Sequence, residues 1–414
     1  MLALGNGRPV LPGLGKKIGR VQSIQIAPSG AERLPRFDYR RHLAALTADP
    51  PAWPERTSAA AVLAFDLVIG RERFGLTMPP RRIRLELLDY PGEWLLDLPL
   101  LQTSFRDWSA GVLSRLQTPA YAEIARDFLA FSLSLPAQAP VHEELAVAGH
   151  KLYVRTLLRL RDEARLALLQ PGRFLMPAPG EAPGYMPFFP HAGEGGLAAL
   201  LAERYDRYVD AARQDLAEPM FGNLDRIVVL ADLLTALHAG PVAFADASGA
   251  LAAAAGALRW RRSWLDSALA LTRFELPPRV ITRLAFAATK SDHVAERQRG
   301  NLLSLLRDAA RGTGEGDVTT GYFAIAAVRC TEDFVWTLEG RPVSAVRGRR
   351  IGDERLGRSY PGEVPDRMPD AAFWAHPFLE LPQFEPRRPP ENGRGGVPEL
   401  GLDALLGFLL ADIL

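Results

Sequence analysis

One segment near residue 90 constrains the fold more than any other. Residues 82–94 read Arg-Ile-Arg-Leu-Glu-Leu-Leu-Asp-Tyr-Pro-Gly-Glu-Trp, an apolar strand pattern that ends in Asp89 and reaches Gly92 three residues later. In nucleotide-hydrolysing sheets a carboxylate at a strand end holds Mg²⁺, and a following glycine lets a backbone N–H approach the terminal phosphate. An ordinary strand that turns through Pro–Gly has the same residues, so this segment alone leaves both interpretations open.

A second apolar run ends in a polar motif. Residues 283–293 finish in Thr289-Lys290-Ser291-Asp292-His293, which resembles the base-reading motif of GTP-binding proteins. The Asp292 carboxylate could accept hydrogen bonds from guanine N1–H and the exocyclic amine, while the Lys290 stem lies along the purine face. Adenine offers no such pair of donors. The structural alternative is a polar strand end that extends into solvent.

With both motifs in this order, the chain resembles the YcjX-like family of bacterial P-loop proteins over nearly its whole length. The resemblance implies a cytosolic protein with a GTPase-like core that binds GTP or GDP with Mg²⁺ and is linked with envelope or heat stress. The long block from Asp89 to Leu101 is the most specific match. The stretches that carry the resemblance are residues 35–39, 51–57, 89–101, 171–175, 287–293 and 326–329.

Roles for four residues around the first motif follow from this resemblance. Asp89 would hold Mg²⁺ through water, Thr57 would bring its hydroxyl to the same ion, and Gly92 would present its N–H to the γ-phosphate. Glu93 follows the glycine, where Ras-like proteins orient the attacking water with a glutamine. A carboxylate there could act as a general base, but it would also repel the phosphate charge. The structural alternatives are a turn residue at Thr57 and a salt bridge from Glu93 to an arginine.

The resemblance also concerns the recognition of the base. Backbone N–H groups of Ala327 and Val328 would support the base oxygen, and Thr289 stands where an asparagine is usual. That threonine keeps an ATPase of the same family open as one alternative. A second alternative is a non-catalytic scaffold or interaction protein whose sheet persists without nucleotide.

A departure from the family pattern is equally informative, because the chain has no Gly-x-x-x-x-Gly-Lys-Ser/Thr phosphate loop. The nearest candidate, residues 13–17, lacks the first glycine and has Lys17 where the Mg²⁺-binding hydroxyl belongs. We therefore expect a start assigned too late, with the first strand and the loop encoded upstream. In a Ras-like sheet that strand lies between the strands ending at Asp89 and near Asp232, so the chain is expected to be marginally stable and to bind nucleotide weakly.

Composition limits the partners. Lys and Arg total 49 against 48 Asp and Glu, a net charge of +1, which gives no bulk attraction to nucleic acid, although arginines cluster at 81–84 and 347–350. A single cysteine, Cys330, excludes an intrachain disulfide and fits a reducing cytoplasm. No apolar stretch approaches the roughly 20 residues that span a bilayer. We predict a cytoplasmic protein without a nucleic-acid partner, with contacts to proteins, including membrane proteins, left open.

Periodicity divides the chain into three parts. The pattern predicts strands near 60–69, 82–88, 226–233, 280–288 and 322–328, and a Pro79–Pro80 turn joins the first two. The later strands alternate with helices, which predicts a mostly parallel, doubly wound α/β sheet. Residues 1–94 and 225–350 form this predicted nucleotide-binding core, with loops and one helix in the first 54 residues. Residues 95–224 form a predicted all-helical insertion, a candidate surface for a protein partner. Residues 351–414 are predicted as a Pro-rich extended segment held by aromatic side chains, followed by a helix that packs on the core.

Overall fold

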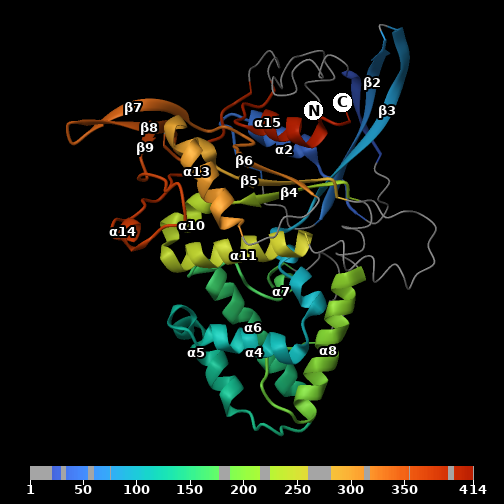
Figure 1. Ribbon diagram of the computed structural model, residues 1–414. Helices are drawn as coiled ribbons and strands as arrows, with labels where there is room; N and C mark the ends of the chain where they lie inside the picture. The colour runs from blue at the N-terminus through green and yellow to red at the C-terminus, as the bar shows by residue number, and fades with distance from the viewer. Residues whose placement is uncertain are drawn as a thin grey trace.

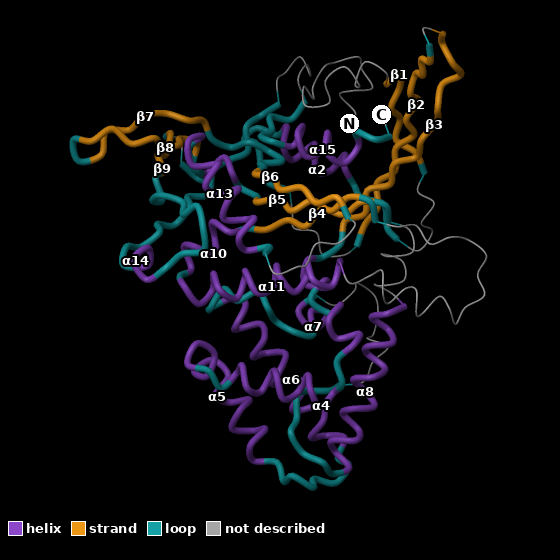
Figure 2. The backbone as a smooth tube through the Cα atoms, viewed as in Figure 1, coloured by secondary structure: helices purple, strands orange, loops and turns teal. Residues whose placement is uncertain are grey.

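The computed structural model describes residues 21–28, 34–54, 60–74, 76–176, 187–214, 224–259, 281–311, 318–353, 355–389 and 396–413. Within these residues, three sheets of three strands each occupy the upper part of the molecule in Figure 1. Figure 2 shows the purple helices α4, α5, α6 and α8 filling the lower part. The protein therefore has a mixed α/β architecture, as the sequence predicted.

The first sheet, sheet A, carries the strand that ends at Asp89. Its order is β1 (Val21–Ala27), β2 (Ala61–Arg73) and β3 (Leu76–Asp89), and all neighbours are antiparallel. The prediction of two adjacent strands is confirmed, but β1 was missed, because the first 54 residues were expected to hold only loops and a helix. That helix is α2 (Tyr39–Thr47). β1 has only a weak alternating pattern in its sequence, and its side chains become buried because the strand pairs with β2.

The turn of the β2–β3 hairpin differs from the prediction. Arg73 pairs with Leu76, so the chain reverses at Phe74 and not at Pro79–Pro80. Both prolines lie within β3, at a register shift opposite Gly70. Among the described strands β3 lies at the edge of its sheet, where a proline that lacks an N–H removes no ladder hydrogen bond. The prolines therefore mark a bulge in a long strand.

Sheet B is parallel, with the order β4 (Arg226–Ala231), β5 (Arg283–Ala288) and β6 (Thr319–Ala324). Leu284 and Phe286 of β5 face the core shared with helices, while Ala285 and Ala287 face the core shared with the C-terminal helix. The prediction of a parallel sheet covered on both faces is confirmed. The covering helices are α10 (Leu233–Ala239), α11 (Pro241–Arg259), α13 (Glu296–Ala309) and α15 (Leu402–Leu410), and a short 3₁₀ helix, η4 (Ser291–His293), follows β5.

Sheets A and B are not joined by ladder hydrogen bonds within the described residues. β3 is the last strand of sheet A and β4 is the first strand of sheet B. Leu230 of β4 is a large apolar side chain that stays exposed. Both β3 and β4 are therefore edge strands in the described part of the chain.

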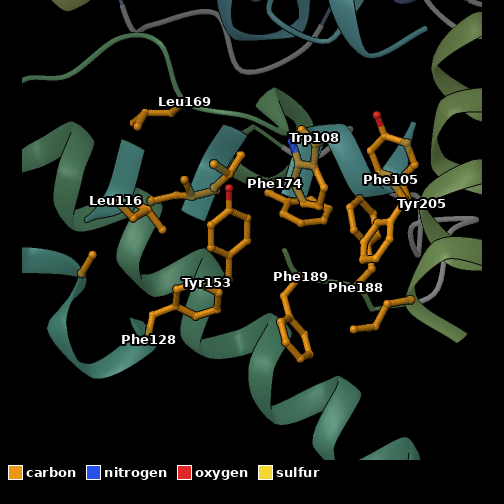
Figure 3. Packing of buried hydrophobic residues seen from close by; sticks show 14 of the residues in the cluster. Phe105, Trp108, Leu116, Phe128, Tyr153, Leu169, Phe174, Phe188, Phe189 and Tyr205 are labelled. Carbon is orange, nitrogen blue, oxygen red and sulfur yellow. The ribbon is translucent and has the colours of Figure 1, made fainter. Parts of the chain in front are cut away.

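Helices occupy the chain between β3 and β4. They bury an aromatic core of their own, in which Trp108 stacks on Tyr205 with ring centroids 5.2 Å apart and meets Phe188 edge-on, as Figure 3 shows. No described helix is long and apolar enough to cross a bilayer. The elements are α3 (Gly92–Leu95), η2 (Leu98–Gln102), α4 (Phe105–Leu116), α5 (Pro119–Ser134), α6 (Glu143–Asp162), α7 (Gly172–Leu175) and α8 (Gly196–Ala212).

The C-terminal part adds a third sheet, which the sequence did not predict. It is antiparallel and consists of β7 (Glu332–Leu338), β8 (Arg341–Arg349) and β9 (Leu356–Ser359). A boundary at residue 350 would divide it, because β9 pairs with β8. Between the third sheet and α15 the described residues have little regular structure apart from α14 (Ala371–Trp374), and the buried rings of Phe378 and Phe384 hold this segment on the body of the protein.

Candidate functional site

The loops that follow β4, β5 and β6 meet at the carboxyl edge of sheet B. The Thr289 N–H donates to the Ala231 carbonyl at 2.9 Å, and the Ser291 N–H donates to the Ile325 carbonyl at 3.1 Å. These bonds join the β5 loop to its neighbours on both sides. In open α/β sheets, ligands bind outside the carboxyl ends of the strands, so this edge is the place to look for a site.

Lys290 has a backbone conformation that is unusual for its residue type. Its φ of 56° and ψ of 26° lie in the left-handed region, which costs a non-glycine residue roughly 1–2 kcal/mol. Its Nζ lies 2.7 Å from Oδ2 of Asp232 and donates to Oγ1 of Thr235 at 3.1 Å. An ion pair this exposed is worth about 1 kcal/mol or less, so it does not repay the backbone cost with a clear surplus. Retained strain of this kind is typical of functional positions.

Asp292 is placed differently from Lys290, because it is buried. Only 1% of the residue is exposed, and Oδ2 accepts hydrogen bonds from the Cys330 backbone N–H at 2.7 Å and from the Cys330 Sγ at 3.1 Å. Its other oxygen, Oδ1, lies 3.3 Å from Nδ1 of His293. The Thr331 hydroxyl donates to the Asp292 carbonyl. The carboxylate thus ties the base-reading motif to the loop after β6.

These contacts set the protonation of the cluster. Burial alone would raise the pKa of the Asp292 carboxyl, but hydrogen bonds from His293 and Cys330 outweigh it and hold the pKa below the ordinary value. Burial, with the nearby carboxylate, raises the pKa of the Cys330 thiol. Ligand atoms of Asp292, His293 and Cys330 all lie within 4.8 Å of one another. Because hydrogen bonds already join the three side chains, we interpret them as a hydrogen-bonded cluster.

Ala327 and Val328 lie beside this cluster, in the loop between β6 and Cys330. Ala327 is exposed and Val328 is half-buried. The preceding residue, Ala326, exchanges two backbone hydrogen bonds with Leu400, at 2.8 and 2.9 Å. The N–H groups of Ala327 and Val328 have no hydrogen-bond acceptor among the described residues, so they remain available donors at this edge.

The other predicted residues lie at the end of β3. Asp89 is half-buried opposite Ala61, and Gly92 begins α3, where a Cβ would meet no heavy atom within 4 Å. Glu93 makes no ion pair with a described arginine, so the salt-bridge alternative is not seen. No described hydrogen bond or ion pair joins these residues to Lys290 or Asp292. Thr57 lies outside the described residues.

Sequence reasoning missed Asp97, which follows α3 and is fully buried. Oδ1 accepts the Gly172 N–H at 2.7 Å, while Oδ2 accepts the Tyr208 hydroxyl at 2.5 Å and the Arg173 N–H at 3.3 Å. Burial raises the pKa of this carboxyl to about 6, although the three hydrogen bonds and the Arg173 charge oppose that rise. Nothing in the local sequence signals this role, since the partners come from distant helices.

Two tryptophans, Trp94 and Trp53, each donate the indole N–H to a backbone carbonyl of a distant segment. The Trp94 indole N–H donates to the Met176 carbonyl at 2.8 Å, and the Arg173 guanidinium lies 5.2 Å from the Trp94 ring centroid. The Trp53 indole N–H donates to the Phe384 carbonyl at 2.6 Å. α3 therefore rests against α7, immediately after the strand end that carries Asp89.

Comparison with known proteins decides the family. The profile of the YcjX-like family, DUF463, matches residues 4–414. The chain belongs to the YcjX-like family. It is 31% identical over 412 residues to the Ras-like GTPase YcjX of Escherichia coli strain K12, an alignment that covers 95% of this chain and 86% of that protein. It is 30% identical over 404 residues to the Ras-like GTPase YcjX of Shewanella oneidensis strain MR-1, which covers 91% of this chain and 80% of that protein.

Proposed function

We propose that this YcjX-like chain is a guanine-nucleotide-binding protein with a Ras-like GTPase core. The observation that carries the proposal is the Thr289–Asp292 turn at the carboxyl edge of sheet B, beside two available backbone donors. The purine lies along the Lys290 stem, and Ala327 and Val328 donate to its O6 oxygen. The names of the two relatives support this assignment.

Base reading requires a rearrangement at Asp292. Its carboxylate is buried, and Oδ1 faces His293 at 3.3 Å, a longer contact than the two at Oδ2. Guanine N1–H and the exocyclic amine therefore compete with His293 for Oδ1 while Cys330 keeps Oδ2 in place. Adenine lacks this pair of donors, because its N1 is an acceptor, so it would leave Oδ1 without the two bonds at a cost of about 1–3 kcal/mol for each lost bond.

The phosphate side of the site belongs to β3 and α3. Mg²⁺ prefers oxygen ligands and is usually held by one or two carboxylates together with phosphate oxygens. Asp89 fits this preference, because its carboxylate has no partner among the described residues, and Thr57 would supply a hydroxyl. Gly92 would donate its N–H to the γ-phosphate. Bound Mg²⁺ would neutralise charge on the β- and γ-phosphates, and Glu93 would orient the attacking water.

Phosphate binding by this chain is expected to be weak. The 414 residues contain no Gly-x-x-x-x-Gly-Lys-Ser/Thr sequence, whose backbone and lysine normally hold the β-phosphate. The discrimination between bases, which depends on a different part of the protein, is therefore a better test than absolute affinity. The alternative of an ATPase predicts equal or stronger ATP binding, and that of a scaffold predicts no nucleotide binding.

The test is a competition titration of the purified chain with GTP, ATP and xanthosine triphosphate, in which ligand-observed NMR measures binding. GTP should outcompete ATP by about tenfold or more. Asp292→Asn should weaken GTP and favour xanthosine triphosphate, whose oxygen replaces the exocyclic amine, and this gain separates base reading from misfolding. Asp366→Asn, at an exposed surface ion pair, is the matched control and should change neither. Equal affinity for GTP and ATP in the parent chain would refute the proposal.

A further inference from the structure

The third sheet turns one of its faces away from the body of the protein. Its hairpin of β7 and β8 extends at the left in Figure 1. The inner face rests on the body, because Asp333 pairs with Arg299 of α13 at 2.8 Å and a Cβ at Gly348 would lie 2.7 Å from the Cys330 carbonyl oxygen. Side chains alternate along a strand, so the opposite, outer face consists of the even-numbered residues of β7 and β9 and the odd-numbered residues of β8.

Arginine side chains lie over two aromatic rings on the outer face. Phe334 and Trp336 of β7 are half-buried, and the Arg358 guanidinium lies 6.0 and 5.9 Å from their ring centroids. Because β8 separates β9 from β7, the Arg358 side chain reaches across the whole sheet. The Arg347 guanidinium lies 5.7 Å from the Phe334 centroid. Flat guanidinium and ring surfaces therefore meet on one face.

Positive charge dominates the outer face. Glu332 is its one acidic residue, and its arginines, all exposed, are Arg341, Arg347, Arg349 and Arg358. Arg347 pairs with Glu332, and Arg349 lies 3.7 Å from Glu385. Arg341 and Arg358 have no ion pair within the described part of the chain. The net charge of the whole chain argued against a nucleic-acid partner, but this face carries a local excess of positive charge.

We propose that the outer face of the third sheet binds single-stranded nucleic acid, with bases stacked on Phe334 and Trp336 and phosphates contacted by the arginines. Every base has a flat face that stacks on an aromatic ring, and a single strand leaves those faces accessible. An exposed cation–π contact is weaker than base stacking, so a base displaces the Arg358 guanidinium from the rings towards a phosphate. An acidic peptide would engage the arginines but offers no flat group to every ring. This inference does not depend on the guanine-nucleotide binding proposed above.

Fluorescence anisotropy of a labelled uridine oligomer of about 12 nucleotides tests the proposal. The oligomer contains no guanine, so it does not report on base reading at Asp292. Arg341→Gln/Arg358→Gln should weaken binding and reduce the slope of log affinity against log salt by about 1.4, about 0.7 for each lost phosphate contact. Arg81→Gln/Arg82→Gln, which changes two exposed arginines of β3, is the matched control and should alter neither quantity.

Replacement of Trp336 separates base stacking from attraction by charge alone. Trp336→Val keeps a strand-forming residue opposite Val343 and should weaken binding about fivefold or more. Val335→Thr changes an exposed side chain on the inner face of the same strand and should leave binding unchanged. Ultraviolet cross-linking of the parent chain, read by mass spectrometry, should attach uridine to peptides of the third sheet, which locates the site without any substitution.

The proposal is overturned if the parent chain does not bind the uridine oligomer, including the case in which it binds only a duplex, an anionic lipid surface or an acidic protein. It is also overturned if the arginine changes weaken binding and Trp336→Val does not, or if the cross-links lie outside the third sheet. A 2′-deoxyuridine oligomer distinguishes the two kinds of strand. Equal affinity supports binding of both RNA and DNA, and tighter binding of the uridine oligomer assigns RNA through its 2′-hydroxyl groups.

Discussion

The hydroxyl of Tyr208 donates to the Asp97 carboxylate at 2.5 Å, which joins α8 to the segment that follows α3. The other oxygen of Asp97 accepts the N–H of Gly172 at the start of α7. Both partners belong to the helical part of the molecule, and Asp97 lies only five residues after Gly92. A fully buried carboxylate therefore connects the helices to α3, where Gly92 is proposed to bind the γ-phosphate.

This carboxylate should give stability a measurable pH dependence. Its pKa is raised from 3.8 to about 6, so the native state binds more protons than the unfolded state between these values. The stabilisation is complete below pH 4 and is lost as the pH rises through 6, and a shift of about two units corresponds to about 3 kcal/mol. In urea titrations, the free energy of unfolding of the parent chain relative to Asp97→Asn should fall by this amount from pH 4 to 7.

Tyr208→Phe is the informative second variant for Asp97. The tyrosine hydroxyl lowers the pKa of the carboxyl, so its removal should move the midpoint of the pH dependence above 6. If the parent chain and Asp97→Asn show the same pH profile, Asp97 does not titrate in this range and the assignment is wrong.

Close packing of α3 on α7 makes a second prediction. A Cβ at Gly172 would lie 1.9 Å from the Glu93 carbonyl oxygen, which is backbone and cannot rotate away. Gly172→Ala should therefore destabilise the protein by about 1–3 kcal/mol. Gly111→Ala is the matched control within α4, where a Cβ meets nothing within 4 Å, and it should stabilise by about 0.5–1 kcal/mol. Thermal unfolding of both variants decides the matter, and equal shifts would contradict the contact.

The sequence predicted the parts of the fold that have strong local patterns. The apolar run of residues 283–288 and the alternation in β2 are readable because burial on one or both faces imposes them. β1 and the third sheet were not predicted, because their strands are stabilised by pairing with strands elsewhere in the chain. In β7 and β8, for example, Trp336 faces Val343 across the ladder, a pairing that no local pattern reveals. The prediction of a turn at Pro79–Pro80 was wrong because a strand at the edge of a sheet tolerates proline.

At the candidate site, motif spacing located the residues but not their environments. The apolar run before Thr289-Lys290-Ser291-Asp292 placed these residues in a loop after a strand, yet the burial of Asp292 depends on Cys330, 38 positions later. Asp97 carried no signal at all, because its donors lie 75 or more positions away in the chain. Long-range hydrogen bonds of this kind arise from packing, and a single sequence does not encode them in a readable spacing.

Replacing Lys290 should change nucleotide binding with little effect on stability. Lys290→Gly relieves the left-handed backbone but loses an exposed ion pair, so the free energy of unfolding should stay within about 1 kcal/mol of the parent value. Affinity for GTP should fall, since the stem that lies along the purine is gone. Glu339→Gly, at another left-handed position in the β7–β8 turn, should stabilise without changing GTP binding. Unaltered GTP affinity in Lys290→Gly would remove Lys290 from the site.

Asp246 on α11 makes the last prediction, which concerns how the helical part is held on the core. Its Oδ2 accepts the Ala167 and Leu168 N–H groups, both at 2.6 Å, and the Tyr121 hydroxyl donates to Oδ1. Asp246→Ala leaves these buried or half-buried donors without an acceptor and should cost about 2–5 kcal/mol. Tyr121→Phe should cost about 1 kcal/mol alone and almost nothing in the Asp246→Ala background, because the two residues share one interaction. Urea unfolding of the four proteins measures this coupling, and strictly additive losses would show that the hydroxyl and the carboxylate act independently.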